Sequence, residues 1–461
     1  MMRPQQIVEV ALRQAQNEQL AVLVEDSSEV NLRWANSSLT TNGLVQGQHV
    51  DIVACPMTFT SGRTATVSGQ VRDESDVVDL VSRARRAASV AAPAEDANFF
   101  PEGRISPDWD ETLPETGPDQ VTHLADGLGE LFDLGTAQEI AHFGYAEHRL
   151  VTTFLGTTSG SRLRFTQPAS RFEDTAKDST GARSAWHGEA GHDFAQMDLT
   201  AIGKLLAQRL SWQERTVTVA PGRHTVLLAP SAVADLMIDM YWSADAESAV
   251  EGRSAFASTD GGTRVGERLG SELTLSSDPQ NPDPSMRCPD FDSSVAATST
   301  SSPFDNGEGL PASEWITDGV LRRLLTTRYT AQKSDLPYAP PVDNLELRTA
   351  GGHGSLTDVA ARLKDGVLIT CLWYNRIVDP TTLLLTGLTR DGVYFVRNGE
   401  IVGSCGNYRF NESPVGLLGR IVDSGATERT LAREMGDYFN RAAMPPLVVE
   451  GFNLSTQSDA T

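Results

Sequence analysis

The sequence predicts an α+β protein of two domains. We expect a mixed sheet with helices in the N-terminal half, and a strongly curved, barrel-like antiparallel sheet with helices in the C-terminal half. Three observations support this class. A chain of 461 residues is too long for one ordinary core. Its long strand-type runs are interspersed with helical segments without the regular alternation of a doubly wound sheet. The pattern changes near residue 215, so the domains are expected over residues 1–215 and 216–461.

The first elements follow from the spacing of apolar residues. A helix is expected over residues 4–17, because Ile7, Val8, Ala11 and Leu12 recur at helical spacing. Short strand-type runs bounded by turn residues follow, with Asn42-Gly43 as one of the expected turns. These strands are expected over residues 20–26, 30–36, 49–56 and 63–71.

The rest of the N-terminal half alternates between helical and strand-type segments. A helix over residues 73–90 has Asp73 or Ser75 as a suitable cap. Residues 91–119 are rich in Pro, Asp and Glu and predict a surface loop. Helices are then expected over residues 119–134 and 198–212, and strands over residues 149–156 and 161–168.

The C-terminal half is expected to be richer in strands. Strands occupy residues 215–230, and a helix follows over about residues 231–250. A loop rich in Ser, Asp and Pro is expected over residues 276–303, before a β-rich region over residues 341–411. Helical stretches are expected over residues 413–424 and 427–439.

The charge and the cysteines restrict the function classes. With 38 basic and 61 acidic residues the net charge is -23, which argues against binding to nucleic acid or an anionic membrane. The compact basic cluster Arg83, Arg85 and Arg86 is interpreted as a solvated helix face. No apolar run is long enough to span a membrane. The four cysteines form no CxxC pair and predict reduced thiols in the cytoplasm.

The stretch HGEAGH resembles a zinc site at first sight. Its histidines, His187 and His192, are five residues apart, which on a regular helix separates them by about 140°. Glu189 is not adjacent to the first histidine, and no third ligand is suggested nearby. We therefore interpret the stretch as a polar turn or hairpin tip without a metal. A metallopeptidase that uses these two histidines and a distant ligand is the alternative.

From residue 215 onward the chain resembles the TldD/TldE (PmbA) family, peptidase-like proteins once called modulators of DNA gyrase. The resemblance rests on a strand–helix segment, a segment before an acidic turn, an "FDNGEG" phrase and a closing block, followed by a terminal strand. These segments lie at residues 224–258, 268–279, 301–333, 392–421 and 444–455. TldD-type members of this family carry HExxxH on the helix and a cysteine near the C-terminus, and they bind zinc. TldE-type members lack both.

The resemblance places Ile238, Asp239 and Ser243 at the three motif positions. Isoleucine has no lone pair for a metal, and a serine hydroxyl is a poor zinc ligand. Cys405 lies upstream of the position expected for the ligand, and no cysteine follows residue 420. The resemblance therefore implies no metal and no catalytic residue in this chain.

What the resemblance implies is a non-catalytic TldE/PmbA-like subunit in the cytoplasm. It pairs with a homologous TldD-type zinc peptidase, and the two chains enclose a chamber for extended, unfolded or leader-bearing peptides that bind by strand addition. Zinc is expected in the partner alone. Asp239, Tyr241 and Trp242 are the candidate chamber-lining residues, with core packing as the alternative for the two aromatic residues. A homodimeric peptide-binding protein without a catalytic partner is the remaining alternative.

Overall fold

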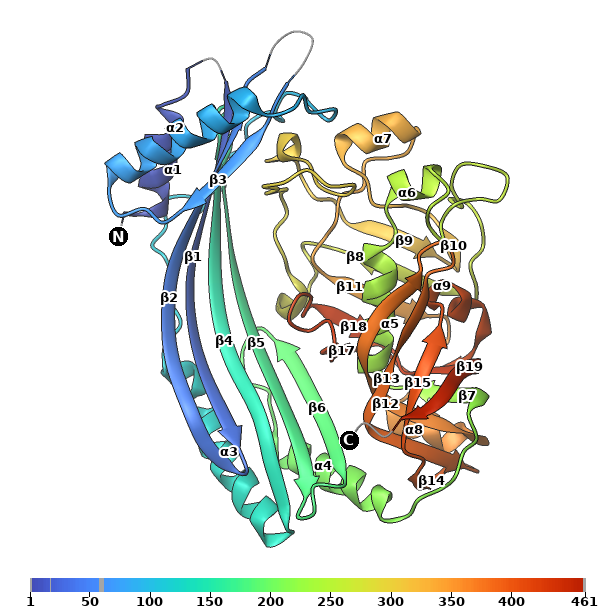
Figure 1. The fold of residues 1–461 in the computed structure, drawn as a ribbon. Coiled ribbons are helices and arrows are strands. Elements are labelled where there is room, and N and C mark those ends of the chain that lie inside the picture. Colours follow the sequence, from blue (N-terminus) through green and yellow to red (C-terminus); the bar gives the residue numbers. More distant parts are fainter. Residues whose placement is uncertain (1, 17, 58–61, 459–461) are drawn as a thin grey trace.

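The computed structural model describes residues 2–16, 18–57 and 62–458. A long, curved sheet from the N-terminal half lies beside a C-terminal half that contains two further sheets (Figure 1). The α+β class is thus confirmed. The strands of the first sheet end at Gly191, and those of the other two begin at Gly222. A domain boundary at residue 215 stays a prediction.

The N-terminal sheet consists of six described strands, all of them antiparallel, in the order β3-β2-β1-β4-β5-β6. A mixed sheet was expected here, and that expectation was wrong. Hairpins join β1 to β2 and β4 to β5, and antiparallel pairing is the natural outcome of such short connections. The strands are β1 (Gln19–Ala35), β2 (Ser38–Cys55), β3 (Ala65–Gly69), β4 (Ile140–Thr157), β5 (Arg162–Asp178) and β6 (Ser184–Gly191).

The turn between β1 and β2 differs from the expected one. Asn36 and Ser37 have φ angles of 51° and 55°, which makes them the two central residues of a tight hairpin turn. Residues 20–26 and 30–36 therefore form one long strand, and Asn42-Gly43 lies inside β2, where Gly43 pairs with Asn31. The local turn preference of Asn42-Gly43 is overridden by the pairing of β1 with β2, which continues along both strands.

Four helices cover the ends of this sheet (Figure 1). Asp73 caps the second of them, because its carboxylate accepts hydrogen bonds from the N–H groups of Ser75 and Asp76. The first helix ends at Leu12, earlier than expected, and residue 17 lies outside the described part of the chain. The helices are α1 (Pro4–Leu12), α2 (Glu74–Val90), α3 (Asp119–Ala137) and α4 (Leu199–Ser211).

The C-terminal half contains two sheets in place of the single barrel-like antiparallel sheet that was expected. Each combines antiparallel pairs with one parallel pair, β11 with β18 in one sheet and β12 with β7 in the other. Within the described residues the first sheet has the order β10-β9-β8-β11-β18-β17. Its strands are β8 (Leu273–Ser277), β9 (Ser313–Thr317), β10 (Val320–Leu321), β11 (Leu345–Thr349), β17 (Glu428–Thr430) and β18 (Ala442–Met444).

The second sheet has the order β12-β7-β19-β15-β13-β14, with β16 against β19. An additional pairing joins β12 to β13. Its strands are β7 (Gly222–Leu228), β12 (Asp365–Asp379), β13 (Leu384–Arg397), β14 (Glu400–Ser404), β15 (Asn407–Glu412), β16 (Ile421–Ser424) and β19 (Leu447–Ser458).

Two helical predictions in this half were wrong in extent or type. Residues 413–424 form only the short helix α9 (Pro414–Leu417), one 3-10 turn and then β16. Residues 427–439 form β17 and a series of turns. In that segment the N–H groups of Glu434 and Met435 bond to a side-chain carboxyl, so they do not bond to carbonyls of a helix. The other short helices are α6 (Ala246–Val250), α7 (Arg328–Ser334) and α8 (Leu356–Arg362).

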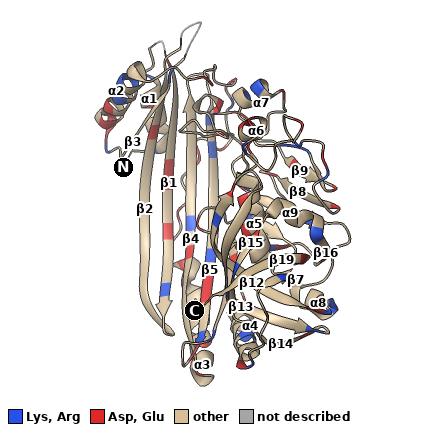
Figure 2. Ribbon diagram, turned by 45° about the vertical axis from the view of Figure 1, so that its right-hand side comes forward, with Lys and Arg blue, Asp and Glu red and all other residues tan. Residues whose placement is uncertain are grey.

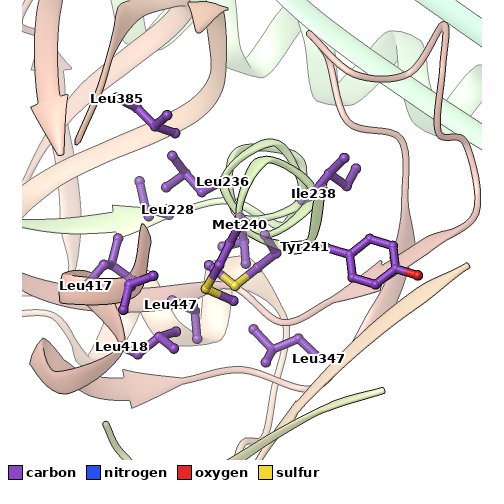
Figure 3. Close-up of a cluster of buried hydrophobic side chains, with 14 of the residues drawn as sticks. Leu228, Leu236, Ile238, Met240, Tyr241, Leu347, Leu385, Leu417, Leu418 and Leu447 are labelled. Atoms are coloured by element: carbon purple, nitrogen blue, oxygen red, sulfur yellow. The ribbon is translucent and has the colours of Figure 1, made fainter. Parts of the chain in front are cut away.

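Helix α5 (Pro230–Trp242) is the centre of the C-terminal core. Pro230 occupies the first helical position, where no intrahelical N–H bond is lost. Leucines from both sheets and from α9 surround the helix, including Leu228, Leu347 and Leu447 (Figure 3). The expected helix over residues 231–250 is interrupted after Trp242, and α6 continues the segment.

Basic and acidic residues are interspersed along the helices, strands and loops (Figure 2). In the basic cluster on α2, Arg85 donates to Glu18 at 2.9 Å and Arg83 lies 3.8 Å from Asp79. Both carboxylates lower the positive potential of the cluster, which agrees with its interpretation as a solvated face. Within residues 2–16, 18–57 and 62–458, no helix has the length and apolar character that a membrane span requires.

Candidate functional site

One face of α5 carries its polar and exposed side chains. Asp235, Asp239 and Trp242 follow at helical spacing, so they share one side of the helix. Asp239 is half-buried and Trp242 is 41% exposed, while the other residues of α5 are buried. A helix buried on all other sides therefore presents a single polar face, and this face is the candidate site.

Asp235 is the innermost group of this face and is fully buried. Its Oδ1 accepts hydrogen bonds from the N–H groups of Glu434 and Met435 at 3.0 and 3.1 Å. Its Oδ2 has no partner among the described residues. Burial raises the pKa of Asp235 well above its ordinary value, against the opposing effect of the two hydrogen bonds. Burial thus favours the neutral form of this side chain, which joins α5 to the segment after β17.

Asp239 lies one helical turn further out. Its Oδ2 is 3.5 Å from Nδ2 of Asn375, a buried residue of β12 whose own Oδ1 has no partner among the described residues. Burial raises the pKa of Asp239 to about 7, with a further rise from Glu434 and opposing effects from Asn375 and Arg376. Near neutral pH this carboxyl exists in both forms, so it is able to donate or accept a hydrogen bond.

Glu434 closes the site on the β12 side. Its carboxylate accepts a hydrogen bond from the N–H group of Tyr374 at 3.0 Å and one from Nη1 of Arg376 at 3.2 Å. Tyr374 is itself exposed, and so is Trp242 at the other end of the face. The site therefore consists of the ionisable carboxyl of Asp239 together with the exposed aromatic side chains of Trp242 on the same helix face and Tyr374 on β12, which suits a polar and partly apolar ligand such as a peptide.

A buried cation lies behind Glu434. The guanidinium of Arg433 stacks between the rings of Trp186 and Trp373, at 4.8 and 5.1 Å from the ring centroids. Its Nη2 forms an ion pair of 2.8 Å with Oδ2 of Asp391. Since Asp391 Oδ2 has no hydrogen-bond donor among the described residues, this contact is an ion pair without a directed hydrogen bond. Trp186 belongs to β6, so Arg433 connects the two halves of the molecule at the base of the site.

The raised pKa of Asp239 predicts a specific dependence of stability on pH. A carboxyl whose pKa is raised in the folded state stabilises it fully below the unfolded pKa, and this contribution is lost as the pH rises through the folded value. A change from 3.8 to about 7 corresponds to about 4 kcal/mol at most. We expect the free energy of unfolding of the wild type to fall by up to that amount between about pH 4 and pH 7, relative to Asp239→Asn.

Urea unfolding at several pH values measures this difference. The control is Asp260→Asn, an exposed aspartate of a surface loop, which should show the same pH profile as the wild type. If the free energies of unfolding of the wild type and Asp239→Asn changed in parallel with pH, the raised pKa of Asp239 would be contradicted.

The three expected site residues have different positions. Asp239 and Trp242 lie on the polar face, and their role in lining a chamber stays a prediction. Tyr241 is only 2% exposed and packs against Trp315 and Phe439, and it lies on the opposite side of α5 from Leu228 and Leu236 (Figure 3). Its hydroxyl donates to the carbonyl of Val342 at 3.0 Å. Tyr241 is thus a core residue, which was the alternative to a lining role.

The resemblance assigned the positions of the two motif histidines to Ile238 in α5 and to Ser243 directly after it. Ile238 is fully buried among apolar residues, and the Oγ of Ser243 donates to the carbonyl of Asp239 at 2.8 Å. Cys405 is buried, and its burial raises the pKa of the thiol to about 12, so it is a neutral thiol. Within the described ranges, no three His, Cys, Asp or Glu side chains lie close enough to hold a metal ion.

The HGEAGH stretch is not a turn, and that interpretation was wrong. Residues through Gly191 form strand β6, in which His187 pairs with Asp174 of β5. His187 Nε2 lies 2.9 Å from Glu189 Oε1, and His192 Nδ1 lies 3.6 Å from an oxygen of Asp193. The strand forms because β5 provides a long antiparallel partner. The glycines in the stretch weaken the strand signal in the sequence, so the strand was not expected.

Sequence reasoning missed Asp235, Asn375 and Glu434. Asp235 precedes Asp239 by one helical turn, so this spacing was the only signal able to reveal it. Asn375 and Glu434 come from β12 and from the turns after β17, and nothing in the sequence near them indicates the shared site.

The chain was also compared with known proteins. Residues 221–456 match the PmbA/TldA metallopeptidase C-terminal domain. Among solved structures, TldE from Thermococcus kodakarensis superimposes with a TM-score of 0.78 at 17% identity, over 97% of this chain and 99% of that chain. A search of curated proteins finds no match.

Two other solved structures have the same fold. Both are described as a putative modulator of DNA gyrase. The protein from Thermotoga maritima has a TM-score of 0.75 at 18% identity, covering 97% of this chain and 98% of that one. The protein from Bacteroides thetaiotaomicron has a TM-score of 0.75 at 17% identity, covering 98% of each chain. At these identities the likeness concerns the fold alone.

Proposed function

Because the chain belongs to the TldD/TldE (PmbA) family, whose C-terminal domain it contains over residues 221–456, we propose that it is a non-catalytic, TldE-type subunit of a metallopeptidase complex. Its partner is a homologous TldD-type chain that carries the zinc. The two chains together enclose a chamber in which unfolded or leader-bearing peptides are cleaved. The complex acts in the cytoplasm, where the four free cysteines remain reduced.

The observation that carries this proposal is the chemistry of α5. Two histidines of a TldD-type helix would occupy the positions of Ile238 and Ser243. A fully buried isoleucine has no donor atom, and the Ser243 hydroxyl already donates within the helix. Without a metal at this place the chain has no means of activating a water molecule there. These residues therefore do not fit zinc, and hydrolysis is assigned to the partner.

The polar face of α5 then serves to seat the peptide. Trp242 and Tyr374 offer apolar surface, and Asp239 offers a hydrogen-bonding group whose protonation adapts to the ligand. An extended peptide binds mainly through its backbone, by addition to a strand edge, so side-chain selectivity is low.

The proposal is tested with purified chains. We measure cleavage of an unfolded peptide by this chain alone, by a TldD-type homologue from the same genome alone, and by the mixture. The mixture is expected to cleave at least about tenfold faster than either chain, with zinc only in the partner. The control is a partner in which the glutamate of HExxxH is replaced by glutamine, which should abolish cleavage by the mixture.

Two outcomes would overturn the proposal. Stoichiometric zinc and cleavage by this chain alone would favour a metallopeptidase that uses His187 and His192. A stable homodimer that binds peptide but neither binds a TldD-type chain nor alters its activity would favour a peptide-binding protein without a catalytic partner.

A further inference from the structure

A cavity of about 490 Å³ lies between the two halves of the molecule, on the opposite end of α5 from the site described above. Its walls include β6 on one side and β17 on the other, and each of these strands is the last of its sheet in the described strand order. The N-terminal end of α5 and residues of α4 also line it. The volume falls within the range of small-molecule and peptide-end pockets.

The floor of this cavity holds a cation without an acidic partner. Arg209 of α4 is only 8% exposed, and its Nη1 donates to the carbonyl of Trp186 at 2.6 Å. No carboxylate among the described residues forms an ion pair with it, and its other guanidinium N–H groups have no described protein acceptor. Burial lowers the pKa of Arg209, which expresses the cost of holding this charge away from water. A bound anion would offset that cost.

The start of α5 adds donors next to this cation. Pro230 occupies the first helical position, and Val233 is the first residue whose N–H group bonds back, to the carbonyl of Ala229. The N–H group of Ser231 therefore has no carbonyl within the helix, and the helix dipole favours an anion at this end. The Oγ of Ser231 is buried and has no described partner, and the residue is 7% exposed. The buried floor thus combines a guanidinium that has no acidic partner among the described residues, a helix N-terminus and an unsatisfied hydroxyl.

Acidic groups are confined to the more exposed rim of the cavity. Glu189 lies there at 2.9 Å from His187, and Glu428 lines the rim from β17. Arg429 is also on the rim, but it lies 3.4 Å from Asp283 and is compensated. The selectivity for an anion therefore comes from the floor.

The edge of β6 leads towards this floor. The carbonyls of Ser184 and Trp186 point away from β5, since they accept bonds from Gln213 and Arg209. Backbone groups alternate in direction along an antiparallel strand, so those of Gly188 and Ala190 point the same way, and both residues line the cavity. An extended chain placed along this edge would end at Arg209.

We propose that this cavity binds the C-terminal carboxylate of an extended peptide, with the carboxylate on Arg209 and the N-terminus of α5 and the last peptide groups along β6. This inference rests on the proposed function, because it assigns the end of the same class of substrate to a second site on this chain. Through this site the subunit recognises the free C-terminus of a peptide. A carboxylate matches the planar fork of a guanidinium, and such charged hydrogen bonds are stronger than neutral ones.

The test uses the full-length chain without its partner and a short fluorescent peptide in two forms, one with a free C-terminal carboxylate and one with a C-terminal amide. Fluorescence anisotropy is expected to show binding of the carboxylate form at least about tenfold tighter. Arg209→Met should reduce the affinity for the carboxylate form to that for the amide. Lys204→Met is the matched control, since Lys204 is an exposed cation on the same helix, and it should keep the preference.

Equal affinities of the wild type for the two peptides would overturn the inference, and this comparison needs no variant. Ser231→Asp is a second variant that a helix N-terminus tolerates, and it should abolish the preference by repulsion. A folded Arg209→Met that retains the preference would also overturn the inference. So would inorganic phosphate that displaces the peptide more strongly than acetate does, because the pocket would then be a phosphate site. A wild-type chain that shows no preference for the carboxylate form but supports normal partner-dependent cleavage would refute this site alone and leave the proposed function standing.

Discussion

Replacing Asp235 by alanine is expected to lower the free energy of unfolding by about 3–5 kcal/mol. The carboxyl is fully buried and accepts hydrogen bonds from the N–H groups of Glu434 and Met435. Alanine would leave both buried donors without an acceptor and would create a cavity beside α5. Each unsatisfied donor costs about 1–3 kcal/mol, which together with the cavity gives the expected loss. Urea unfolding at neutral pH measures it.

The variant Asp235→Asn tests whether the loss of stability in Asp235→Ala comes from the lost acceptor and the cavity or from the loss of a negative charge. Burial raises the pKa of Asp235 well above its ordinary value and so favours the neutral form, and asparagine retains the carbonyl acceptor at nearly the same volume. This variant should lose less than about 1 kcal/mol. As the pH rises through the folded pKa of Asp235, the wild type loses stability and the asparagine variant does not. The stability of the variant relative to the wild type should therefore increase at higher pH. A loss in the asparagine variant as large as that in the alanine variant would show that Asp235 is ionised in the fold.

Arg433→Met is expected to cost about 3–5 kcal/mol, because it removes the nearest cation from the buried carboxylate of Asp391 and leaves it with the hydroxyl of Ser184 and the more distant Arg390 at 3.6 Å. The Asp391 side chain is 4% exposed and lies 2.8 Å from Nη2 of Arg433. Methionine also loses the cation–π contacts with Trp186 and Trp373, which are worth about 2 kcal/mol or more when desolvated. Since Trp186 belongs to the N-terminal sheet and Trp373 to the C-terminal one, the transition should also become less cooperative.

A double-mutant cycle with Asp391→Asn checks the charge argument. Asparagine tolerates the positive φ of 49° at this position, so the single change adds little backbone strain. The double variant Arg433→Met with Asp391→Asn should recover about half of the loss, since no charge then remains buried without a partner. Strictly additive losses would mean that Arg433 stabilises the fold through its stacking alone.

The sequence identified most of the secondary structure where a segment is long and its periodicity is clear. Helix α2 begins at its expected cap Asp73, and α5 begins within one residue of the expected position. The errors occur where a distant partner overrides local preference. Asn42-Gly43 has the composition of a turn but pairs along β2, and residues after Glu428 have helical periodicity but bond to Asp235.

What the sequence by itself determined is the chemistry available on α5 and the family to which the chain belongs. Ile238 and Ser243 exclude imidazole ligands at two motif positions whatever the fold, because ligand identity is a property of the residue. Only the tertiary structure decided that Tyr241 is core and that Asn375 and Glu434 lie near Asp239. It also decided that Arg209 lines a cavity without an acidic partner in the described part of the chain. Burial, pKa and proximity depend on segments far apart in the chain, and no local pattern encodes which of them come together.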